Sequence, residues 1–192
     1  MTITDESIVT ERCLDFVKKL TSPHEWTAAD YESIPEEVIC EIYDGGLFVT
    51  PSPTVGHQRA VSDLSRIFEL FVDRFLVAGD VDVQVAADIF KPDLIVMREH
   101  FEGRPVQSAN VQLVGEVISD NENIERTKKK VAYAAAGIPA YIIIDGRKGE
   151  RTAEIYRLIK DEYELVALVP RDGQLTTTEP FTYAIDMNKI NK

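Results

Sequence analysis

Two acidic residues lie in or directly beside apolar segments, where the negative charge of a carboxylate has to be compensated. Asp93 follows Pro92 at the head of an apolar run, Leu94–Met97, and Glu116 lies inside a second run, Leu113–Ile118. An ionised glutamate in a dry interior is costly unless a cation, a proton or solvent compensates it. Carboxylate oxygens are the hard ligands that Mg²⁺ prefers, with positions left for water and a phosphate oxygen. The pair is therefore a candidate magnesium site.

A lysine near these carboxylates would orient an attacking water and offset charge developing at phosphorus. The densest positive cluster, Arg126–Lys130, lies on a predicted helix that follows Glu116. At about 100° per residue, the buried stripe of that helix comprises Ile124, Thr127, Val131, Ala135 and Ile138. Lys129 then points away from the core, while Lys128 and Lys130 flank the stripe. Spacing alone leaves both flanking lysines open.

Two smaller features stand next to this pair. Gly115 directly precedes Glu116 and leaves room for close approach by a backbone or a ligand. His57 lies in the first turn of a predicted long helix, four residues before Val61, and a lone histidine there is more often a hydrogen-bonded structural residue. The chain has only three histidines, which argues against a histidine-rich zinc site.

These residues require a sheet with helices beside it, and apolar periodicity predicts both kinds of element. Helices are expected over 6–20, 28–31, 55–75 and 124–136, and strands over 38–43, 47–49, 81–85, 93–97, 111–118, 141–144, 152–159 and 163–169, followed by a tail strand near Tyr183. Asp44-Gly45-Gly46 and Lys160-Asp161-Glu162 mark hairpin turns. The order predicts an α/β (α+β) fold: one mixed sheet flanked by helices, with additional β-hairpins.

Length and composition predict one soluble domain over residues 1–192. It would consist of an N-terminal helix at about 6–20, a core at about 25–150 and a C-terminal hairpin extension at about 151–192. No apolar run approaches the ~20 residues that cross a bilayer, and the acidic N-terminus is unlike a signal peptide, so we expect a cytoplasmic protein without a membrane partner. Cys13 and Cys40 are expected to be reduced thiols.

The net charge restricts the possible partners. A charge of −12 should repel DNA globally, because proteins that bind phosphates usually carry a basic stripe. A nucleic-acid interaction must then rest on a local site, with a divalent cation offsetting part of the acidity. Symmetric homodimers are the default among soluble oligomers, so a homodimer is expected on general grounds alone.

The chain resembles the Uma-type putative restriction endonuclease family, which belongs to the PD-(D/E)xK nuclease superfamily. The resemblance spans about residues 25–150 and rests on ordered motifs: Glu41–Gly45, Pro51–Pro53, His57-Gln58, Lys91–Val96, Glu116–Ser119 and Lys130–Tyr141. It implies a restriction-endonuclease-like fold. It also implies that Asp93, Glu116 and Val117 form the metal set, holding Mg²⁺ or Mn²⁺.

The resemblance also assigns the lysine. In the superfamily this lysine usually lies two residues after the acid, where this chain has Ile118. The family moves it to the following helix, and the alignment selects Lys130, with Glu41 as an assisting acid. His57 and Lys128 form a second tier. An acidic residue often precedes the lysine by four positions, where this chain has Arg126.

Two functions follow as expectations. The first is a metal-dependent endonuclease that hydrolyses DNA phosphodiester bonds, with Lys130 orienting or activating water. The second is a catalytically idle protein of the same fold that serves as a binding or structural module. The complete Asp, Glu and Lys set favours the first, and the acidic balance together with Arg126 favours the second.

Overall fold

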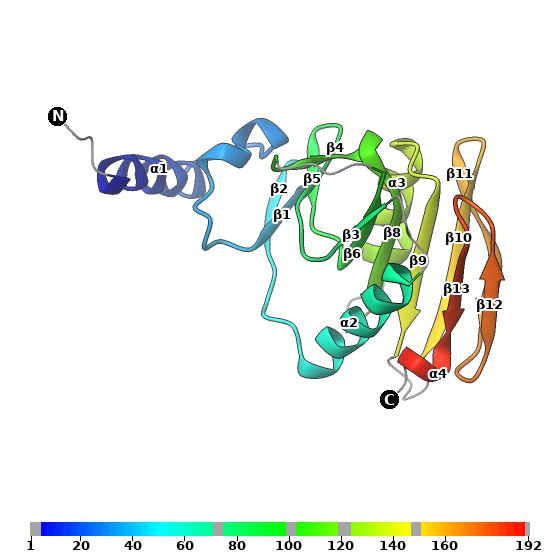
Figure 1. The fold of residues 1–192 in the computed structure, drawn as a ribbon. Helices are drawn as coiled ribbons and strands as arrows, with labels where there is room; N and C mark the ends of the chain where they lie inside the picture. Colours follow the sequence, from blue (N-terminus) through cyan, green and yellow to red (C-terminus); the bar gives the residue numbers. More distant parts are fainter. Residues whose placement is uncertain (1–4, 71–74, 99–102, 119–123, 147–150, 191–192) are drawn as a thin grey trace. The chain divides into compact units, whose positions relative to one another are not determined.

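The computed structural model describes residues 5–70, 75–98, 103–118, 124–146 and 151–190, with side chains from Cys13 onward within these ranges (Figure 1). It contains two compact units, Met1–Ser52 with Ala86–Phe90, and Pro53–Val85 with Lys91–Lys192. The single domain predicted for 1–192 stays a prediction, and each unit is described by itself. The polar segment 120–123 lies outside the described residues.

The first unit joins a helix to a small antiparallel sheet. Its elements are α1 (Asp5–Leu20), the 3₁₀ helix η1 (Ala28–Ser33), β1 (Cys40–Tyr43), β2 (Gly46–Val49) and β5 (Asp88–Phe90). β1 pairs with β2 and with β5, placing Glu41 opposite Phe48. Asp44 and Gly45 adopt φ values of 50° and 73°, which confirms the predicted hairpin turn.

The second unit contains a six-stranded mixed sheet in the order β11-β10-β9-β8-β6-β3. The strands are β3 (Leu76–Ala78), β6 (Leu94–Met97), β8 (Val111–Ile118), β9 (Ala140–Asp145), β10 (Thr152–Ile159) and β11 (Glu162–Val169). Only the β8–β9 pair is parallel among these neighbours. A parallel pair needs a crossover, and here the crossover carries the π-helix η3 (Ile124–Lys129) and α3 (Lys130–Ala135). The predicted mixed sheet with flanking helices is confirmed.

Smaller elements complete this unit. They are α2 (Val55–Glu69), β4 (Val83–Val85) paired with β7 (Val106–Gln107), η2 (Ser108–Asn110), β12 (Gln174–Thr177) paired with β13 (Tyr183–Asp186), and α4 (Met187–Ile190). Thr54 caps α2, since its hydroxyl accepts the His57 backbone N–H at 3.2 Å. Among the described residues, no helix combines the length and apolar character needed to cross a bilayer.

Opposite faces of the sheet carry different helices. Gly115 on β8 faces α2, and a Cβ built there would lie 3.2 Å from the Leu64 side chain. The room beside Gly115 is therefore filled by core side chains rather than by a ligand. Because successive strand residues point to opposite faces, Glu116 points away from α2. Its partners come from η3 and α3, which contact it from the other face.

Several predicted boundaries are corrected. α2 ends at Glu69, not at residue 75, and Phe75 packs against the core from the segment that leads into β3. The apolar spacing continues past the helix because both segments supply the same core. The strand expected over 81–85 is shortened to β4, and the short strands β3, β5 and β7 were not predicted. The tail is a hairpin plus α4, not a single strand near Tyr183.

Candidate functional site

Glu116 is a buried carboxylate with two side-chain donors. Its residue is 3% exposed, and Oε1 accepts hydrogen bonds from Lys129 Nζ at 3.0 Å and from the Tyr133 hydroxyl at 3.1 Å. The Lys129 ammonium is equally buried, so the two groups form an ion pair in the interior. The compensation that a buried glutamate needs is thus supplied by a cation and a phenol.

Asp93 lies one residue before β6 and is bound to β8. Its Oδ2 accepts the Val117 backbone N–H at 2.7 Å, and His57 Nε2 lies 3.2 Å from the same oxygen. Leu94 pairs with Gly115, so the position opposite Val117 belongs to Pro92. Proline has no N–H to donate to the ladder. The Val117 N–H donates to the Asp93 carboxylate in place of a backbone carbonyl.

The register of β6 and β8 also indicates where the Val117 backbone carbonyl points. In a strand, the N–H and C=O of one residue point to the same side, and the Val117 N–H points toward Asp93. The Val117 carbonyl therefore points to the end of β6, where Pro92 cannot donate to it. Asp93, Glu116 and Val117 thus offer two carboxylates and one carbonyl from adjoining positions.

The prediction that Lys129 points away from the core is wrong. Residues 124–129 form a π-helix, whose i→i+5 hydrogen bonds bring residues five apart to the same side. In an α-helix Lys129 would be turned about 140° from Ile124, whereas the wider turn brings the two residues close to alignment. The predicted stripe fails for the same reason: Thr127, Val131 and Ala135 are exposed.

The other basic residues of the cluster have different partners. Lys130 Nζ lies 4.0 Å from the centroid of the Tyr156 ring, and Lys128 is exposed. Arg126 pairs with Asp145 at 3.0 Å and with Glu154. Much of the positive charge that the sequence concentrates at 126–130 is therefore already paired within the protein.

Sequence reasoning missed Lys129 and Tyr133. The resembling run began at Lys130, one residue too late to include the lysine that contacts Glu116. One available signal was the four-residue spacing of Lys129 and Tyr133, which places both on one helical face. Glu125 lies four positions before Lys129, the spacing at which the resemblance implies an acidic residue.

The segment leading to Asp93 is fixed by the β3–β4 loop. Lys91 Nζ donates to the Asp80 carbonyl at 2.7 Å and lies 3.6 Å from the Asp82 carboxylate. A Cβ built at Gly79 would lie 3.0 Å from the Asp93 carbonyl oxygen, so glycine permits this close approach. The loop therefore positions the backbone of Asp93.

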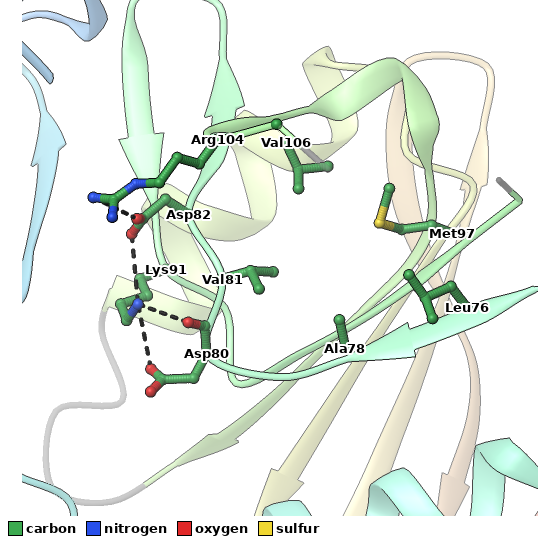
Figure 2. Close-up of a pocket in the computed structure, with 10 residues that line it drawn as sticks. Leu76, Ala78, Asp80, Val81, Asp82, Lys91, Met97, Arg104 and Val106 are labelled. Carbon is green, nitrogen blue, oxygen red and sulfur yellow. Dashed lines mark hydrogen bonds and ion pairs between the residues drawn. The ribbon is translucent and has the colours of Figure 1, made fainter. Parts of the chain in front are cut away.

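A cavity of about 280 Å³ lies beside this loop (Figure 2). Figure 2 shows its charged residues gathered at one end, with Leu76, Ala78 and Met97 at the other. Arg104 Nη2 lies 3.9 Å from Asp82, so both cations of the cavity face carboxylates of the same loop. Asp93, Glu116 and Lys129 are not among the residues that line it.

His57 and Glu41 complete the predicted site residues. The hydrogen bond and charge of Asp93 raise the pKa of His57 above its ordinary value near 6.5, although burial opposes the shift. His57 Nδ1 is buried without a hydrogen-bond partner among the described residues. Glu41 is buried on β1 in the first unit, whereas Asp93, Glu116, Lys129 and His57 all belong to the second.

The donor set is compatible with a hard divalent cation. No group of three or more His, Cys, Asp or Glu side chains within the described ranges is placed to hold a metal. Mg²⁺, however, is usually held by one or two carboxylates, with water and substrate oxygens completing its shell. Two carboxylates and the Val117 carbonyl match that pattern, and thiolate or imidazole-rich chemistry is not needed.

Comparisons with known proteins identify a family and a shared fold. A family model described as Uma2, putative restriction endonuclease, matches residues 28–188. The structure is similar to a crystal structure from Anabaena variabilis described as a putative nuclease belonging to DUF820. That likeness has a TM-score of 0.67 at 18% identity and covers 86% of this chain and 97% of the other. A comparison with curated proteins gave no match.

The structural likeness confirms the predicted fold. An identity of 18% supports a shared architecture, and the covered share shows that nearly the whole of the other chain is represented here. The predicted resemblance to the family is confirmed over a longer range than expected, since the match extends into the C-terminal hairpin.

Proposed function

Because this chain belongs to the Uma2 putative restriction endonuclease family, we propose that it is a metal-dependent nuclease that hydrolyses DNA phosphodiester bonds. The observation that supports this most directly is the buried ion pair of Glu116 and Lys129. It lies next to Asp93, which directly precedes β6 and binds the neighbouring strand β8. A nuclease of this superfamily needs two acids and a lysine in one place. The second unit supplies all three.

Each residue has a separate role in the proposal. Asp93, Glu116 and the Val117 carbonyl would hold Mg²⁺ or Mn²⁺, with His57 and the Val117 N–H fixing Asp93 Oδ2. The bound cation would stabilise charge developing at phosphorus and favour ionisation of water. Lys129, not Lys130, would orient the attacking water, since its ammonium is the one that reaches Glu116.

Electrostatics make the cation important for substrate approach. The net charge of −12 and the paired cations of residues 126–130 leave little positive potential for a polyanion. A divalent ion held by the two acids would reverse the sign of charge locally. We therefore expect substrate binding to depend on the metal and to weaken steeply with salt.

Metal binding is tested by thermal unfolding. Mn²⁺ at about 100 times its Kd should stabilise the protein by about 2.7 kcal/mol, and Asp93→Asn should abolish the rise in Tm. Asp161→Asn, in the exposed β10–β11 turn, is the matched control and should keep it. An equal rise in wild type and Asp93→Asn would contradict the metal site.

Catalysis is tested by cleavage of plasmid DNA in Mn²⁺, at a temperature at which circular dichroism shows each variant folded. Lys129→Met should lower the rate on the order of 10²-fold, the loss typical for one transition-state donor. Lys130→Met and Lys128→Met should have small effects. A loss with Lys130→Met alone would return the role to the lysine selected by sequence. Metal binding without cleavage would favour the idle alternative.

A further inference from the structure

Arg126 attaches the π-helix over residues 124–129, called the π-turn below, to β9 and β10. Its Nη2 donates to Asp145 Oδ2 at 3.0 Å and also to Glu154 Oε1. Asp145 ends β9, and Glu154 lies on the neighbouring strand β10. Glu154 is fixed in turn, because its Oε2 accepts the Tyr156 hydroxyl at 2.6 Å. All three charged side chains are at most one-quarter exposed.

We propose that Arg126 is a positioning residue, which holds residues 124–129 against β9 and β10 and thereby keeps Lys129 on Glu116. Nothing in the family assignment gives this residue a role. The inference rests on the proposed function only for its effect on activity. The structural part, that Arg126 keeps Lys129 at Glu116, stands on the contacts of this turn with β9 and β10.

The direction of Lys129 follows from the helix that it begins. Lys129 has α-helical backbone angles, φ −60° and ψ −44°, and lies four residues before Tyr133, so both side chains share the face that meets Glu116. The π-helix before it is a rare conformation, found mostly as a single turn within an α-helix and frequently at functional sites. Contacts that hold this turn on the sheet therefore hold the start of the helix, and with it Lys129, at Glu116.

Two further contacts from the sheet support the same turn. The Tyr141 hydroxyl donates to the Glu125 carbonyl at 3.0 Å, and the Lys130 ammonium lies over the Tyr156 ring. Positions 125, 126 and 130 are thus all attached to β9 or β10. Lys129 lies between these anchors in sequence. Arg126 is the anchor with two ionic partners.

Removing the guanidinium should release the turn. Asp145 and Glu154 would then face each other without their shared cation, and breaking a partly buried ion pair from one side leaves uncompensated charge. Repulsion between the carboxylates would disfavour the present packing of the turn. We expect residues 124–129 to separate from β9 and β10, with Lys129 exposed.

The first test measures the accessibility of Lys129 without using activity. Under native conditions, acetylation of Lys129 followed by mass spectrometry should be slow in the wild type, where the side chain is 5% exposed. Arg126→Gln should raise that rate on the order of tenfold, as for a locally opened segment, while the Lys91 rate stays unchanged. Arg66→Gln, which removes an exposed pair with Asp63, is the matched control.

Unchanged protection of Lys129 in Arg126→Gln would overturn the proposal. If that variant does not fold, Glu154→Gln supplies the same test, since it keeps the size of the side chain and removes one ionic partner. Arg126→Lys should restore most of the protection, because a single nitrogen contacts both acids in the structure.

The second test is a double-mutant cycle on Mn²⁺-dependent cleavage. Arg126→Gln should lower kcat with little change in KM, and should have no further effect once Lys129 is methionine. Equal losses in both backgrounds would show a general structural role and contradict positioning through Lys129. A Lys129→Met variant with full activity would refute the proposed role of Lys129 in catalysis, while the acetylation result would still decide the role of Arg126.

Discussion

The Glu116–Lys129 pair is an unusual way to fill the interior of a sheet protein. Two apolar side chains of similar volume would avoid the desolvation cost that a buried ion pair carries. Stability alone therefore does not explain why these two groups are buried together. A site in which a carboxylate must stay ionised does explain it, because the ammonium and the Tyr133 hydroxyl both favour the charged form.

The energetic coupling of this pair can be measured. Lys129→Met should destabilise the protein by about 3–5 kcal/mol, because Glu116 would remain buried without its cation. Adding Glu116→Gln should recover part of that loss. Chemical denaturation of the wild type, both single variants and the double variant gives the coupling free energy. Additive effects would show that the two charges do not interact in the folded protein.

The pKa of His57 depends on the neighbouring Asp93 carboxylate. The Asp93 carboxylate raises the His57 pKa above 6.5, so protonated His57 stabilises the folded state. That contribution is complete below pH 6.5 and is lost as the pH rises through the raised value. Titration of the imidazole by NMR should give a pKa above 6.5 in the wild type. Asp93→Asn should bring it to or below 6.5, and an unchanged value would exclude Asp93 as the cause.

At the scale of elements, one carboxylate connects α1 to η1. Asp30 accepts a hydrogen bond from the Lys19 ammonium of α1 at 2.9 Å and from the Thr27 backbone N–H at the start of η1 at 3.0 Å. Burial alone would raise the pKa of Asp30, but these hydrogen bonds lower it to about 2. The N-terminal helix is therefore attached by a charged group.

This attachment predicts an acid-sensitive first unit. The lowered pKa of Asp30 contributes stability that is present above about pH 4 and is lost as the pH falls toward 2. A shift of this size corresponds to about 2 kcal/mol. Asp30→Asn should remove most of that amount at pH 7 and little at pH 2, measured by denaturation at both values. Glu37→Gln, at an exposed position before β1, is the control and should change neither.

The π-turn shows how the geometry of one element changes which helix residues face the core. A stripe drawn at 100° per residue placed Thr127 and Val131 in the core, yet both are exposed. From Lys129 onward, Lys129, Tyr133 and Ala134 are the buried positions, at ordinary helical spacing. One wide turn is enough to shift the helical positions of the residues before it relative to those of the residues after it.

For the molecule as a whole, the C-terminal segment belongs to the core of the second unit. The core cluster that contains Leu64 also contains residues of the last hairpin and α4: Phe181, Tyr183, Ile185, Met187 and Ile190. The predicted description of residues 151–192 as an extension understates this role. Without these side chains, α2 would lose much of its apolar cover.

Truncation tests that conclusion. Deleting residues 171–192 should abolish the cooperative thermal transition, because several fully buried side chains are lost and each large-to-small core change alone costs about 2–5 kcal/mol. Circular dichroism and limited proteolysis provide the measurements. Lys189→Gln, at an exposed position within the deleted segment, is the control and should melt like the wild type. A truncated chain with an unchanged melting curve would show that the hairpin is dispensable.

The sequence by itself determined most of the architecture. Apolar, β-branched runs placed the strands around Leu94–Met97 and Val111–Ile118, and the turn residues placed both hairpins, because these are local properties of the chain. The positions of the two acids were also predictable from sequence, since Asp93 stands directly before one apolar run and Glu116 inside another, and both runs become central strands. The family match agrees with the motifs quoted from the sequence.

Only the tertiary structure decided which lysine contacts Glu116. Regular helical periodicity counted from Ile124 excluded Lys129, and the π-turn that changes this phase is attached through Arg126 to Asp145 on β9 and Glu154 on β10. Likewise, the hydrogen bond from the Val117 N–H to Asp93 depends on how β6 and β8 align in the sheet. Both outcomes depend on long-range pairing and local backbone geometry, which residue spacing along one segment does not specify.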